Sequence, residues 1–233
     1  MTDKVRNWIE AMPKQFRPVK KDDPTYPTHL IKPSSMIVTI GPTGCGKTNS
    51  IVEFLHRKDG RFFEIIIYTG SSSDEPLYQY LAGAIDGLKL IDNVGELPNI
   101  DTYKDSESKD LEKLIVFDDS VMSDEKVLKQ IAKWFMCARK VGFTCMFLAQ
   151  DYVSTPKFIR RNAHYLQLFN LADMSDVKRI LSKYAKETDV RTLTNMLTYC
   201  TQDKGNFLTI AVNEPTETKY RQNFIGILDP DEF

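Results

Sequence analysis

The sequence contains few cysteines, and their spacing does not suggest paired or metal-bound thiols. The four in 233 residues are Cys45, Cys137, Cys145 and Cys200, and none belongs to a C-x-x-C pair. Disulfide-stabilised domains and zinc sites place cysteines at short or regular spacings. We therefore expect reduced thiols in a reducing compartment and no structural metal site.

The sequence also lacks long apolar runs and a large net charge. No stretch approaches the roughly 20 apolar residues that span a membrane, and the N-terminus lacks the apolar region of a signal peptide, so we expect no membrane insertion. The formal net charge is −1, which excludes a chain-wide surface for polyanions. Any such surface must be local, or be created when several subunits assemble. The histidines His29, His56 and His164 are scattered and indicate packing or surface roles.

Composition divides the chain into three parts. Residues 1–35 carry five prolines among basic residues and predict an N-terminal arm, most simply a strap packed across the domain. Residues 36–213 alternate short apolar runs with longer helical periods and form the predicted domain. Residues 214–233 are expected to be a C-terminal tail.

The apolar runs of the domain predict strands that are covered on both faces. They span residues 36–40, 63–68, 114–117 and 143–148, with a further pair at 165–169 and 207–212. Apolar residues at helical spacing predict one helix over 127–138, capped by Ser123 and ended by Gly142, and another over 177–184. This alternation predicts a three-layer α/β domain in which helices flank a central, mostly parallel sheet.

The segment after the first predicted strand matches the phosphate-loop pattern G-x-x-x-x-G-K-[ST], and the next residues can open a helix. Its glycines permit backbone angles that turn successive N–H groups toward one anion, and the helix N-terminus adds its dipole. The pattern therefore predicts ATP as ligand, with Lys47 at the β- and γ-phosphates and the Thr48 hydroxyl on Mg²⁺. The predicted nucleotide-binding residues are Gly41, Pro42, Thr43, Gly44, Cys45, Gly46, Lys47, Thr48 and Asn49.

Two adjacent acids end the strand at 114–117. Asp118 stands where a strand-end carboxylate holds Mg²⁺, directly or through water, and Asp119 is placed to orient and deprotonate the attacking water. The later strand at 143–148 leads to Gln150, which can sense the γ-phosphate or position the water. The phosphate loop upstream favours the roles of the two acids, whereas spacing alone leaves Gln150 open as an ordinary polar residue at a strand exit.

These features together resemble the FtsK–HerA superfamily of DNA-pumping ATPases, and within it the genome-packaging ATPases of poxvirus-type large DNA viruses and virophages. The likeness covers residues 36–184. Its more specific parts are Ile115-Val-Phe-Asp-Asp119, the pair Ala138-Arg139, and the segments 147–152 (FLAQDY) and 156–162 (PKFIRRN). Many members carry Glu at the second acidic position, where this chain has the shorter Asp119.

The resemblance implies a RecA/ASCE-like P-loop fold and a homo-oligomeric ring, pentameric or hexameric, that threads double-stranded DNA and works at a viral capsid or portal vertex. It implies a location in the cytoplasm of the host cell, at the viral factory, or in the virion. In such rings an arginine of the neighbouring subunit completes the site by stabilising charge on the transferring phosphoryl group. The candidates are Arg139, Arg160 and Arg161, and the sequence does not choose among them.

Three alternatives remain at this stage. A cellular DNA translocase or helicase of the same superfamily would use the same chemistry. A small nucleoside or nucleotide kinase would share the loop and the sheet, but the sequence shows no clear arginine-rich lid. A switch or scaffold that binds ATP without turnover would need neither Asp119 nor Gln150.

Overall fold

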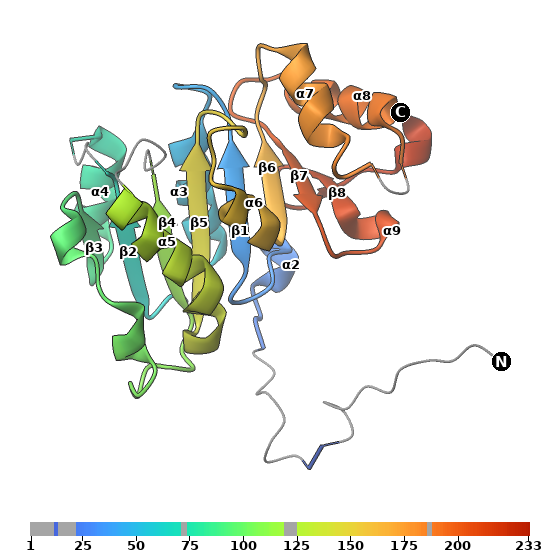
Figure 1. The fold of residues 1–233 in the computed structure, drawn as a ribbon. Coiled ribbons are helices and arrows are strands. Elements are labelled where there is room, and N and C mark those ends of the chain that lie inside the picture. The colour runs from blue at the N-terminus through green and yellow to red at the C-terminus, as the bar shows by residue number, and fades with distance from the viewer. Residues whose placement is uncertain (1–11, 14–21, 71–73, 119–124, 186–187) are drawn as a thin grey trace.

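The computed structural model describes residues 12–13, 22–70, 74–118, 125–185 and 188–233 (Figure 1). Within them the strands form one nine-stranded sheet in the order β3-β2-β4-β5-β1-β6-β7-β8-β9. The six strands from β3 to β6 are parallel, and β6 to β9 are antiparallel. The strands are β1 (Met36–Ile40), β2 (Glu64–Tyr68), β3 (Leu88–Ile91), β4 (Lys113–Phe117), β5 (Phe143–Ala149), β6 (Tyr165–Leu168), β7 (Leu208–Ala211), β8 (Tyr220–Gln222) and β9 (Gly226–Ile227).

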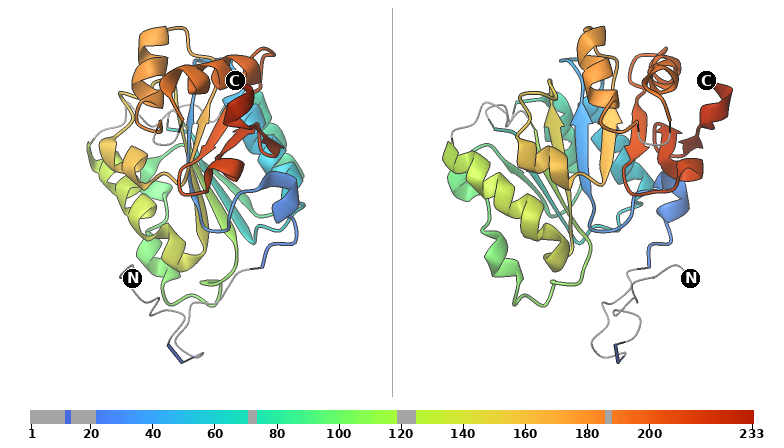
Figure 2. Two further views of the ribbon diagram at one scale, coloured as in Figure 1. Left: turned by 90° about the vertical axis from the view of Figure 1, so that its right-hand side faces the viewer. Right: turned by 45° about the vertical axis from the view of Figure 1, so that its right-hand side comes forward.

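Helices cover both faces of this sheet, as Figure 2 shows in side view. The α-helices are α2 (Tyr26–His29), α3 (Lys47–Arg57), α4 (Pro76–Ala84), α5 (Glu125–Cys137), α6 (Lys157–Asn162), α7 (Met174–Leu181), α8 (Val190–Cys200) and α9 (Thr216–Lys219). Short 3₁₀ helices are η2 (Val94–Glu96), η3 (Ile100–Tyr103), η4 (Ala138–Val141) and η5 (Pro230–Glu232).

The core has two layers because side chains along each strand alternate between the faces. From β1, Val38 joins the layer under α5, together with Trp134, whereas Ile37 joins the layer under α3 and α4, together with Phe54. All five residues of β1 are buried, as are all seven of β5. The predicted three-layer α/β fold with a mostly parallel sheet is confirmed.

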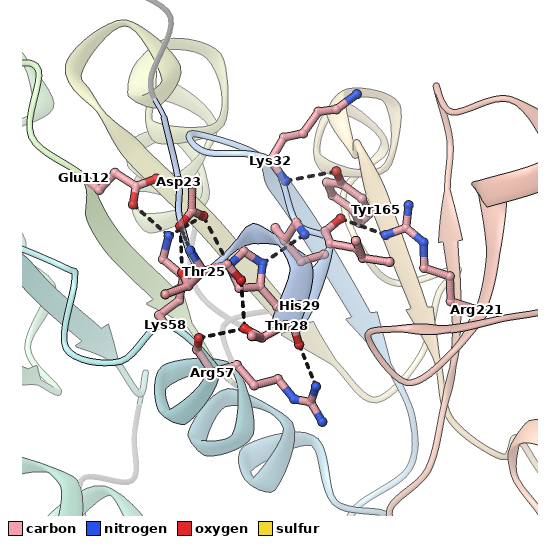
Figure 3. A network of polar contacts seen from close by, with 12 residues as sticks. Asp23, Thr25, Thr28, His29, Lys32, Arg57, Lys58, Glu112, Tyr165 and Arg221 are labelled. Carbon is pink, nitrogen blue, oxygen red and sulfur yellow. Dashed lines mark hydrogen bonds and ion pairs between the residues drawn. The ribbon is translucent and has the colours of Figure 1, made fainter.

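Residues 22–35 of the predicted N-terminal arm pack against the domain through a buried polar network (Figure 3). Asp23 accepts a 2.8 Å hydrogen bond from Lys58, which also pairs with Glu112 at 2.7 Å. His29 is fully buried, with its Nε2 3.2 Å from Asp23, and its Nδ1 accepts from the Ile31 amide at 3.0 Å. The described part of the arm is therefore attached to the end of α3, in a packing role.

The C-terminal segment differs from the tail that we expected for residues 214–233. It contributes β8 and β9 to the sheet, and Tyr220 of β8 is fully buried. Arg221 is 1% exposed, donates a 2.7 Å hydrogen bond to the carbonyl oxygen of Leu30, and lies over the ring of Tyr165 (Figure 3). Pairing with β7 and contacts with the N-terminal arm hold this polar segment in the sheet.

Candidate active site

The loop between β1 and α3 has the backbone that the phosphate-loop pattern predicts. Gly44 and Gly46 have φ values of +73° and +112°, a region that side chains rarely adopt. A Cβ added at Gly41 would lie 2.7 Å from Cβ of Phe169, so the loop leaves β1 in contact with the residue after β6. These three positions require glycine, each for a conformational or steric reason.

Lys47 begins α3, and its ammonium group lies against the loop. Its Nζ donates to the carbonyl oxygens of Gly41 at 2.7 Å and of Pro42 at 3.0 Å. The loop leads directly into α3, whose N-cap Gly46 makes no side-chain cap hydrogen bond, so it combines a positive side chain with a helix N-terminus. Burial raises the pKa of the Cys45 thiol, which keeps this side chain uncharged beside the lysine.

The sheet brings the other predicted residues to this loop. The Gly41 amide donates to the carbonyl oxygen of Ala149 at 3.1 Å, which places Gln150 beside the start of the loop. The Asp118 amide donates to the carbonyl oxygen of Tyr68 at 2.8 Å, at the ends of β4 and β2. Because the parallel strands end at one edge, which is the top of Figure 1 for β1 and β5, the loop and both side chains meet there.

A cavity of about 480 Å³ lies at this edge. Of the predicted residues it is lined by Thr43, Gly44, Gly46, Lys47, Thr48, Asn49, Asp118 and Gln150. Gly41, Pro42 and Cys45 complete the loop behind it, and Pro42 lines a smaller neighbouring cavity together with Gln150. The structure thus brings together the predicted nucleotide-binding residues, the predicted metal ligands and the glutamine.

The predicted base, Asp119, lies outside the described residues. The three arginines are described, and none lines the cavity of its own chain. Arg139 is exposed in η4, before the start of β5 and therefore at the opposite edge of the sheet. In α6, Arg161 is exposed, and Arg160 lies 4.8 Å over the ring of Tyr152.

Two features of the site were missed by reasoning from the sequence. Tyr78 of α4 donates a 2.5 Å hydrogen bond to Oδ2 of Asp118, and burial first, then the Asp118 charge, raise the pKa of its phenol above the usual range. Gly205, with φ of +95°, approaches the loop so closely that a Cβ on Gly46 would lie 3.0 Å from its Cα. Neither residue belongs to a motif, and only the tertiary fold brings them to the site.

The oxygen donors of the site suit Mg²⁺. The Thr48 hydroxyl and the Asp118 carboxylate line the same cavity, and Mg²⁺ prefers hard oxygen ligands, with few from protein and the rest from water and phosphate. The described residues contain no group of three or more His, Cys, Asp or Glu that could hold a metal by themselves. The residues present therefore fit an ion that is bound together with a nucleotide.

The parallel sheet, the glycine loop leading into α3 and the carboxylate at the end of β4 define the fold of a P-loop NTPase. Solved structures of DNA-packaging enzymes have this fold. The genome-packaging NTPase B204 of Sulfolobus turreted icosahedral virus 2, in complex with AMP, aligns over 82% of this chain and 98% of its own, with a TM-score of 0.58 and 16% identity. The DNA-packaging ATPase B204 of Sulfolobus turreted icosahedral virus aligns over 78% and 95%, with a TM-score of 0.54 and 16% identity.

A further similar structure is the pCW3 conjugation coupling protein TcpA with ATPγS, with a TM-score of 0.52 and 16% identity over 85% of this chain and 62% of that one. These structures confirm, for the fold, the resemblance stated above. No protein-family model matches the chain, and no curated protein sequence matches it significantly. Within the described residues, no helix has both the length and the apolar character needed to cross a membrane.

Proposed function

We propose that this chain is an ATPase that uses hydrolysis of ATP to ADP and phosphate to translocate double-stranded viral DNA into a capsid. The observation that carries the proposal is the convergence of Lys47, Asp118 and Gln150 on one cavity at the carboxyl edge of the sheet. A protein that only binds nucleotide needs the loop but not a polar side chain at the end of β5. The fold shared with genome-packaging NTPases supports the packaging role.

In this proposal the loop binds the phosphates of ATP. Backbone N–H groups of residues 43–48 and the Lys47 ammonium neutralise the β- and γ-phosphates. Thr48 and Asp118 would hold Mg²⁺, which would supply positive charge next to the phosphates. Asp118 after β4 and Gln150 after β5 line the same cavity as the loop, which supports a γ-phosphate site between them.

The two remaining polar groups act on the attacking water. Asp119 accepts its proton as general base, and Gln150 orients it in line with the bond that breaks. The proton passes from water to the Asp119 carboxylate, the water oxygen bonds to the γ-phosphorus, and the bridging oxygen leaves on ADP.

The site is completed by a neighbouring subunit in a homo-oligomeric ring, pentameric or hexameric, around the duplex. Arg139, Arg160 or Arg161 of that subunit stabilises charge on the transferring phosphoryl group. Support comes from their position, since none of the three lines the cavity of its own chain. Arg139 and Arg161 are exposed and so accessible to a neighbour, whereas Arg160 stacks on Tyr152. The ring would act at a capsid or portal vertex, in the cytoplasm of the host cell or in the virion.

The proposal is tested by two assays on the purified chain. We expect ATP to yield free phosphate without any nucleoside acceptor, and we expect ATP-dependent displacement of a third strand from a DNA triplex, with both lost in Lys47→Ala. Phosphate that appears only on an added nucleoside would instead establish a kinase. The likeness to TcpA favours, as second candidate, a translocase of cellular type, which would displace the third strand equally well but would not associate with capsids.

A further inference from the structure

Tyr78 reaches the candidate active site from an element that carries no motif. It lies in the first turn of α4, which begins at Pro76, and is 1% exposed. The ring packs in the core layer under α3 and α4 with Leu81, while the hydroxyl extends into the lining of the cavity. The apolar part of the side chain is therefore accounted for by packing, and the hydroxyl needs a separate explanation.

The hydroxyl contacts both residues that fit Mg²⁺. It donates to Oδ2 of Asp118 at 2.5 Å, the length of a charge-assisted O–H···O⁻ bond. The side chain of Thr48 interacts with the same phenol. One buried group from α4 thus connects the first turn of α3 to the end of β4.

The geometry limits what this group can do. Because Tyr78 is buried and its hydroxyl donates to Oδ2, it restricts the rotation of the Asp118 carboxylate. Side chains that hydrogen-bond to metal ligands in this way set the orientation of the ligand, and their loss weakens metal binding by roughly 10- to 100-fold. A phenylalanine would fill the same space without this bond.

We propose that Tyr78 is a positioning residue of the metal site, whose hydroxyl orients Asp118 and Thr48 so that both can bind Mg²⁺ together with the nucleotide. This inference rests on the proposed function, because it concerns the same site. It assigns a role in metal affinity to a helix outside the phosphate loop and the strand ends.

The test compares Tyr78→Phe with the unsubstituted chain, using Mn²⁺ as probe. Electron paramagnetic resonance measures free Mn²⁺ during titration of the protein with a non-hydrolysable ATP analogue present. We expect the dissociation constant for Mn²⁺ to rise about 10-fold in Tyr78→Phe. Affinity for the analogue in EDTA should stay unchanged, because the loop and Lys47 are intact.

The matched control is Tyr80→Phe, since Tyr80 lies on the same helix and is 66% exposed. It should leave the dissociation constant for Mn²⁺ unchanged, and circular dichroism should show that both variants are folded. Equal or tighter Mn²⁺ binding by Tyr78→Phe would overturn the assignment while leaving the proposed function intact. Failure of the unsubstituted chain to bind the analogue both with Mn²⁺ and in EDTA would overturn the proposed function, and this assignment with it.

Discussion

The amide of Gly41 donates a 3.1 Å hydrogen bond to the carbonyl oxygen of Ala149. This bond continues the parallel pairing of β1 with β5 by one residue, to the point where the phosphate loop begins and β5 ends. It fixes the distance between the loop and the residue after Ala149. Gln150 is therefore positioned beside the loop by the sheet itself.

Gln150→Ala should reduce turnover while leaving ATP binding nearly unchanged. The side chain lines the cavity but is not part of the loop that holds the phosphates. Loss of one pre-positioned polar group at a reacting centre costs about 100-fold in kcat. Steady-state phosphate release and equilibrium binding of a fluorescent ATP analogue separate the two effects. A Gln150→Ala enzyme with undiminished kcat would remove this residue from the mechanism.

The two adjacent acids should behave differently when each is replaced by its amide. Asp118→Asn should weaken Mn²⁺ binding in the presence of nucleotide, because Asp118 lines the cavity with Thr48. Asp119→Asn should retain metal binding and lose turnover by about 100-fold or more, as expected for removal of a general base. Metal titration and phosphate release on both variants check this division. Loss of metal binding in Asp119→Asn with retention in Asp118→Asn would reverse our assignment.

Mixing inactive subunits should show which arginine acts across the interface. Lys47→Ala and a variant with the catalytic arginine replaced by alanine should each lose about 10³-fold or more in turnover. A mixed ring contains interfaces that pair an intact Lys47 with an intact arginine, so turnover should partly recover. Arg139→Ala, Arg160→Ala and Arg161→Ala are each mixed with Lys47→Ala in turn. Recovery with none of the three would contradict a site completed by these residues.

His29 should make the stability of the fold depend on pH. Burial first, and then the Lys58 ammonium, lower the pKa of His29 from 6.5 to about 4, and its Nδ1 is occupied as acceptor for the Ile31 amide. At pH values between about 4 and 6.5, His29 is protonated in the unfolded chain but not in the folded chain. The free energy of unfolding should therefore fall by about 2–3 kcal/mol as the pH drops from 7 to about 4.5.

Urea unfolding at the two pH values measures this loss. In His29→Gln the free energy of unfolding should depend less on pH, although the charged neighbours Asp23, Lys58 and Arg57 remain. The control is His56→Gln, because His56 is exposed on α3 and should leave the slope as it is in the unsubstituted chain. Equal slopes for His29→Gln and the unsubstituted chain would contradict the role given to His29.

Local sequence patterns were sufficient to predict the central strands and the loop. The strands β1, β4 and β5 are buried on both faces, so their apolar runs are continuous, and the phosphate loop follows one of them directly. The edge strand β3 was missed because it is short and half-exposed, with Lys89 facing solvent. A short strand with this alternation is hard to distinguish from a loop.

Tertiary contacts explain what the sequence did not reveal. Arg221 is polar, yet it is buried in β8 because the carbonyl oxygens of Thr218 and Leu30 accept its hydrogen bonds. Tyr78 lies 40 positions before Asp118 and reaches it only because the fold brings α4 to the same side of the sheet, where Tyr78 shares a core cluster with Leu114 and Val116 of β4. No spacing rule connects such pairs, so these parts of the fold and site required the structure.

The most direct test of the central claim is the rate of ATP turnover with and without duplex DNA. We predict that duplex DNA raises the rate, that the increase falls steeply between about 50 mM and about 200 mM salt because phosphate contacts dominate DNA affinity, and that Lys47→Ala abolishes turnover in every condition. Turnover by the unsubstituted chain that is the same with and without duplex DNA at both salt concentrations would contradict a DNA-translocating ATPase.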